Sequence, residues 1–179
     1  MTTTLTRERA DLLESLRRHR GFLRQTVVGV TEEQARTRST VSELTLASLI
    51  KHVADTEQGW IDFARGKPDA MGGDADLDEA AMRAATESGE FVDTRFVLAE
   101  EDTLPALLEQ YDRVAAATDE VVATADLDAT RPLPRAPWFE PGAVWSVRRV
   151  LLHVIAETSQ HAGHADIIRE AIDGARTMG

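Results

Sequence analysis

The sequence predicts an all-α protein folded as a four-helix bundle. Four long segments show the three- and four-residue spacing of apolar side chains that marks a helix with one buried face. Residues that start or stop helices flank three of these segments. With 179 residues, the chain is long enough to bury a substantial core, and we expect residues 1–179 to form a single domain.

The first two helices are expected in the N-terminal third of the chain. One spans about Thr6 to Val28, where leucines and valines recur on one side. The other starts after Thr45, a residue type that favours the N-cap, and continues through LASLIKHVADTEQGWIDFAR. Gly66 and Pro68 follow and are expected to end it.

The third and fourth helices carry clear terminal signals. The third begins after Thr103, with Pro105 in the first turn, where a missing N–H costs little. Ser146 is expected to cap the fourth helix, which covers Val147–Ile172, and Gly174 is its expected stop.

Two connections differ in character. Residues 66–102 form a long acidic stretch in which we expect a short helix over residues 77–85 and an extended piece over residues 90–100. This stretch is long enough for a crossover, so the second and third helices need not be antiparallel neighbours. Residues 131–142 read RPLPRAPWFEPG and form a proline-rich loop before the last helix.

Composition excludes several classes of function. A formal net charge of −11 disfavours binding to a nucleic-acid backbone or to an anionic membrane surface. No apolar run reaches the length of a membrane span, and the N-terminus lacks the apolar core of a signal peptide, so we expect a cytoplasmic protein. The absence of cysteine excludes disulfides, thiolate metal sites and cysteine nucleophiles. Any metal must therefore be held by His, Asp or Glu.

Residues 153–164, HVIAETSQHAGH, concentrate ionisable groups on one helix face. At 3.6 residues per turn, His153, Glu157, His161 and His164 lie at roughly 0°, 40°, 80° and 20° around the axis. The last three continue the apolar stripe of the helix, where core side chains are normally found. A buried carboxylate needs a partner, and Arg148 lies far round the helix, as does Arg169.

A divalent metal would satisfy this requirement. Glu157 and His161 lie one turn apart and can point two ligands at one ion. His52, at the edge of the apolar stripe in IKHVADTE, is the best candidate for a third ligand from another helix. Two histidines and one carboxylate leave coordination positions open, which is the pattern of a catalytic rather than a structural site.

The same residues also fit simpler roles. His52 has the position of an ordinary core or boundary histidine, and His153 could support the ligands or lie at the boundary of the core. His164 fits an alternative ligand or a polar group that faces the substrate. Trp138 and Trp145, at the proline-rich loop, fit either loop packing or the roof of a pocket.

The blocks TLASLIKHVADTE and SVRRVLLHVIAETSQHAGHADIIRE together resemble the DinB-like superfamily, most closely its mini-circle protein branch. The resemblance spans essentially the whole chain. It implies a four-helix bundle in up-down-down-up order with a long crossover between the second and third helices. It also implies a metal held by His52, Glu157 and His161, with Glu157 where many relatives have histidine. Related mycothiol-dependent maleylpyruvate isomerases are similar in using glutamate there.

The resemblance further implies a thiol-dependent enzyme. Characterised relatives are S-transferases and an isomerase that use mycothiol, bacillithiol or glutathione with a small-molecule substrate, and many are homodimers. A divalent metal, zinc first and nickel, manganese or iron next, would activate the thiol. The alanine-rich composition, with Lys51 and Lys67 as the only lysines, is typical of high-GC genomes and favours mycothiol. Trp138, Trp145 and His164 are the expected cofactor-binding residues.

Two other functions compete with this one. A non-catalytic metal-binding or stress-related bundle, acting as a ligand binder or dimeric interaction module, would hold metal at the same residues without turnover. A metal-free domain would instead use Glu157 and the histidines as a buried polar network. Chelation would leave the melting temperature of that domain unchanged.

Overall fold

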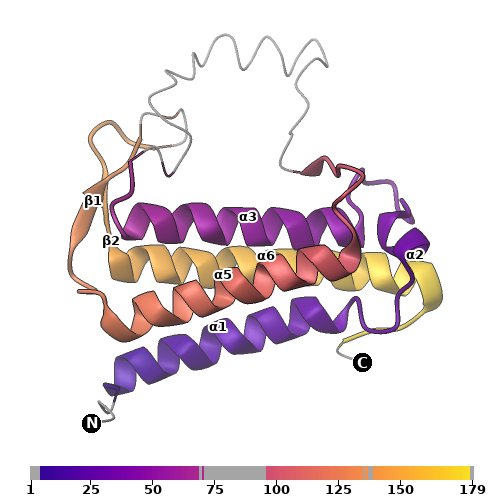
Figure 1. Ribbon diagram of the computed structural model, residues 1–179, viewed down its shortest axis with the longest axis horizontal. Coiled ribbons are helices and arrows are strands. Elements are labelled where there is room, and N and C mark those ends of the chain that lie inside the picture. The colour runs from indigo at the N-terminus through magenta and orange to yellow at the C-terminus, as the bar shows by residue number, and fades with distance from the viewer. Residues whose placement is uncertain (1–4, 69, 71–95, 135, 137–138, 178–179) are drawn as a thin grey trace.

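A computed structural model of the chain describes residues 5–68, 70, 96–134, 136 and 139–177. In this part of the chain the protein is a helical bundle with one small pair of strands, which confirms the predicted all-α fold class (Figure 1). The helices are α1 (Arg7–Gln25), α2 (Glu32–Arg36), α3 (Leu46–Ala64), α5 (Leu104–Thr124) and α6 (Val147–Asp173). None of the helices described is long and apolar enough to cross a membrane.

The predicted helix ends are confirmed by their hydrogen bonds. The side chain of Thr45 accepts from the backbone of Ser48 at the start of α3, in a capping box. Thr103 and Ser146 accept in the same way at the starts of α5 and α6. Gly174 ends α6 with a φ of 79°, a left-handed conformation that favours glycine.

The four long helices pack in the up-down-down-up order that the resemblance implied. In Figure 1, α1 and α6 run one way along the bundle, and α3 and α5 run the other way. The main packing contacts join α1 to α6, α6 to α3, α3 to α5 and α5 back to α1. Because α3 and α5 are parallel, the end of α3 and the start of α5 lie at opposite ends of the bundle. The helix expected over residues 77–85 and most of the extended piece expected over residues 90–100 lie outside the described residues.

Two short features were not predicted. The strands β1 (Thr130–Pro132) and β2 (Val144–Ser146) pair antiparallel on either side of the proline-rich loop, with Arg131 opposite Trp145. Strands this short carry no alternating pattern that sequence could reveal. The strand pair holds Trp145 immediately before α6. The five-residue helix α2 was also missed, although its Thr31 and Gln34 form a capping box.

A buried polar layer separates the apolar core into two clusters, one toward each end of the bundle. Arg20 on α1 is 5% exposed and forms an ion pair with Glu57 on α3, which is 1% exposed. Thr118 on α5 donates its hydroxyl to Glu57 at 2.5 Å, and Asp119 accepts from Arg20 at 2.9 Å. Three helices are therefore joined by one buried network.

Candidate metal centre

His52 faces the seam between α3 and α6. The cap at Thr45 starts α3 so that His52 lies in its second turn, where the side chain is buried against the neighbouring helix. His52 is 2% exposed, and its ring stacks on that of Phe96 with ring centroids 4.1 Å apart. Nδ1 of His52 is buried and has no hydrogen-bond partner among the described residues. The other ring nitrogen, Nε2, points toward α6.

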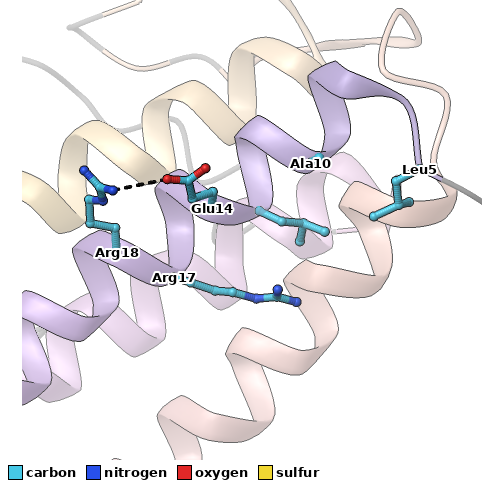
Figure 2. A pocket seen from close by; sticks show the side chains of 6 residues that line it. Leu5, Ala10, Glu14, Arg17 and Arg18 are labelled. Carbon is cyan, nitrogen blue, oxygen red and sulfur yellow. Dashed lines mark hydrogen bonds and ion pairs between the residues drawn. The ribbon is translucent and has the colours of Figure 1, made fainter.

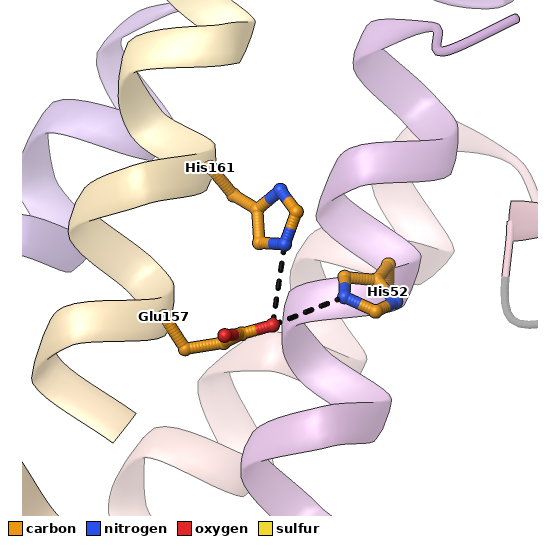
Figure 3. A group of neighbouring side chains, drawn as sticks. All are labelled: His52, Glu157 and His161. Carbon is orange, nitrogen blue, oxygen red and sulfur yellow. Dashed lines mark hydrogen bonds and ion pairs between the residues drawn. The ribbon is translucent and has the colours of Figure 1, made fainter. Parts of the chain in front are cut away.

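Glu157 and His161 meet this nitrogen from α6. Oε1 of Glu157 lies 3.4 Å from Nε2 of His52 and 3.2 Å from Nε2 of His161 (Figure 3). The two imidazole rings are 4.7 Å apart and nearly perpendicular, at 74°. The structure therefore brings together the three residues that the sequence singled out as ligands.

The donor set fits a divalent ion. One ligand atom from each of His52, Glu157 and His161 lies within 4.8 Å of the other two. Two ligands that are each about 2.1 Å from a tetrahedral ion are themselves about 3.4 Å apart. The two separations from Oε1 of Glu157, 3.4 and 3.2 Å, match this edge length. Two imidazole nitrogens with one carboxylate oxygen suit zinc, and also nickel, manganese and iron.

The site keeps Glu157 ionised. Hydrogen bonds with His161 and then with His52 hold the pKa of Glu157 well below its ordinary value, while partial burial opposes them. The side chain is 24% exposed, so it lies at the edge of the core. As expected from the helix geometry, neither Arg148 nor Arg169 compensates it: Arg148 pairs with Glu8 and Asp128. Arg169 pairs with Asp173.

His164 lies behind His161, on the side away from Glu157. The Nδ1 atoms of the two rings are 3.4 Å apart. In a hydrogen bond between them, one Nδ1 carries the proton that the other accepts, so this contact constrains the orientation of the His161 ring. His164 is thus placed to support His161.

Trp145 belongs to an aromatic cluster at the start of α6. It stacks on Trp60 with centroids 4.9 Å apart, and His153 lies edge-on to both rings. His153 is one turn from Glu157, which connects this cluster to the metal centre. Burial lowers the pKa of His153. Trp138, the other expected cofactor-binding tryptophan, lies outside the described residues.

Sequence reasoning missed two residues at the site. Phe96 covers His52, but nothing in the spacing of its segment links it to α3. Arg149 lies over the ring of Trp145, with its guanidinium carbon 4.2 Å from the ring centroid. The four-residue steps from Arg149 through His153 to Glu157 were a signal for this residue, because they place all three on one helix face.

A separate hollow lies on α1, lined by Leu5, Ala10, Leu13, Glu14, Arg17 and Arg18 (Figure 2). It shares no residue with the metal centre, and all but one of its lining residues are exposed. Glu14 and Arg18 form an ion pair across it at 3.2 Å. These features describe a solvated helix face, so we assign it no role.

Comparison with known proteins gives a family match and a similar fold. The model of a family described as MST, mycothiol-S-transferase, matches residues 11–174. A conserved protein from Enterococcus faecalis, known from its crystal structure, is similar in fold with a TM-score of 0.62 and 16% sequence identity. The alignment covers 92% of this chain and 96% of that one. A search of curated proteins finds no match.

Proposed function

The chain belongs to the mycothiol-S-transferase family, and we propose that it is a divalent-metal-dependent thiol S-transferase. The observation that carries this proposal is the convergence of the Nε2 atoms of His52 and His161 on Oε1 of Glu157. Such a three-residue set leaves coordination positions free for a ligand, as catalytic metal sites do.

The proposed reaction joins a thiol to an electrophilic carbon. The sulfur forms a bond to this carbon, a leaving group departs with its electron pair, and the thiol proton is released to solvent. A bound divalent metal supplies the Lewis acidity that lowers the pKa of the thiol into the neutral range. Mycothiol is the thiol that we propose, on the basis of the family match.

The side chains around the centre have distinct proposed roles. The ionised Glu157 would partly neutralise a cation bound between α3 and α6, and its hydrogen bonds hold the rings of His52 and His161 in place. His164 orients His161 through the contact between their Nδ1 atoms. Trp145 and its neighbours form the wall next to the reacting groups, on the side where α6 begins.

The proposal is tested by thiol consumption with defined metal content. Chelator-stripped protein is reloaded with zinc, nickel, manganese or iron, and each form is incubated with mycothiol and a panel of alkyl and aryl electrophiles. Turnover should depend on the metal and disappear in Glu157→Ala. Metal binding without turnover on any thiol and electrophile would instead support the non-catalytic metal-binding alternative.

A further inference from the structure

Arg149 stands at the end of a row of polar side chains on α6 that leads to the metal centre. The row is spaced by four residues and consists of Arg149, His153, Glu157 and His161. Residues at this spacing are neighbours on the helix surface. In this row, His153 lies between Arg149 and the candidate ligands Glu157 and His161.

An aromatic platform supports Arg149. Its guanidinium lies 4.2 Å from the ring centroid of Trp145, and Trp145 stacks on the buried Trp60 at an interplanar angle of 13°. His153 packs against these two rings with centroid distances of 5.2 and 4.7 Å. A guanidinium lying over an aromatic face keeps its N–H groups free at its edge, where they can bind a carboxylate in the fork geometry.

The charge of Arg149 is not neutralised by any residue that the structure describes. No carboxylate among the described residues forms an ion pair with it, whereas the adjacent Arg148 is paired with both Glu8 and Asp128. The residue is exposed, and its cation has no ion-pair partner in the described part of a chain whose net charge is −11. The two adjacent arginines thus differ: Arg148 ties elements of the fold together, and Arg149 is available to an anionic ligand.

From these observations, and resting on the thiol transfer proposed above, we propose that Arg149 and Trp145 bind a carboxylate carried by the electrophilic substrate. Eight residues of helix separate Arg149 from Glu157, which is about 12 Å along the axis. The substrate class is therefore an electrophile whose carboxylate is on the order of 10 Å from the carbon that the sulfur attacks. Trp145 and His153 would contact the part of the substrate between them.

The kinetic test uses two electrophiles of this length that differ only in a terminal carboxylate or carboxamide, with the thiol and metal held constant. Arg149→Gln should lower kcat/KM about 10-fold or more for the carboxylate, since a charge-assisted hydrogen bond is lost. For the carboxamide, kcat/KM should change less than about 2-fold in the same variant. Arg148→Gln is the matched control, because it removes the same charge from the adjacent position. Equal losses for both electrophiles in Arg149→Gln, or no loss for either, would overturn the proposal.

A binding measurement separates this proposal from the proposed function. Unreactive analogues of the two electrophiles are titrated into metal-loaded protein without thiol, and binding is followed by calorimetry. The wild type and Arg148→Gln should bind the carboxylate about 10-fold more tightly than the carboxamide, and Arg149→Gln should lose this preference. A preference that persists in Arg149→Gln overturns the carboxylate site. If the preference behaves as expected but no thiol is consumed by the wild type, the carboxylate site stands and the transferase activity is refuted.

Discussion

Oε1 of Glu157 lies 3.4 Å from Nε2 of His52, although 105 residues separate them in the chain. The contact crosses the seam between α3 and α6, and the same oxygen also faces His161 one turn further along α6. A half-buried carboxylate is thereby stabilised by two imidazoles before any ion binds. Because the donors already converge, little reorganisation is needed to accept a metal.

Replacing Glu157 with glutamine should weaken metal binding sharply. Glu157→Gln keeps the shape of the side chain but removes the anionic donor. Even residues that only support a ligand change metal affinity 10- to 100-fold, so we expect the Kd for zinc to rise by about 100-fold or more. Competition with a chromophoric chelator measures this Kd. Glu170 is an exposed glutamate on the same helix, so Glu170→Gln is the control and should leave the Kd for zinc unchanged.

His164 should tune the centre without being required for it. Its Nδ1 contact with His161 orients the ring, so His164→Ala should raise the Kd for the metal by about 10-fold. At saturating metal the variant should still bind a full complement of ions. An affinity equal to that of the wild type would show that the orientation of His161 does not depend on His164.

The Arg20–Glu57 ion pair should matter for stability rather than for the metal. Arg20→Met leaves Glu57 buried without its counter-charge, which costs about 3–5 kcal/mol of unfolding free energy. The double variant Arg20→Met/Glu57→Leu removes both charges and should recover most of this loss. Urea denaturation of the three proteins tests the account, and a double variant no more stable than Arg20→Met would contradict it.

His153 should make the stability of the metal-free protein depend on pH. Burial holds the pKa of His153 below its ordinary value of 6.5, so the unfolded chain takes up the proton first as pH falls. The free energy of unfolding should therefore decrease as pH drops through 6.5 toward the lower folded pKa. His153→Gln should flatten this slope between roughly pH 7 and pH 5. Denaturation at several pH values in the presence of EDTA measures this slope. Identical slopes in the wild type and His153→Gln would contradict the role given to His153.

Most of the helical framework could be predicted because its signals are local. Thr45, Thr103, Ser146 and Gly174 each act at the helix end where the sequence placed them. Capping depends only on a few neighbouring residues, so it survives whatever the rest of the chain does. The strands β1 and β2 depend instead on pairing across the proline-rich loop, which no local pattern records.

The candidate site was predictable for a different reason. Glu157 and His161 interrupt an apolar stripe, and charged groups in a stripe need partners. The same rule applied to α1 and α3 would have found Arg20 and Glu57, each of which occupies a core position. Phe96 lies outside the long helices, so helical spacing holds no information about its contact with His52.

Metal content is the most direct test of the central claim. Tag-free wild-type protein, His52→Ala and His161→Ala would be reloaded with zinc, dialysed and assayed by elemental analysis, with circular dichroism to confirm that each variant is folded. We expect about one equivalent in the wild type and a loss of it in both folded variants. A full equivalent retained in either folded variant, or none in the wild type after reloading with zinc, nickel, manganese and iron, would contradict the three-residue centre.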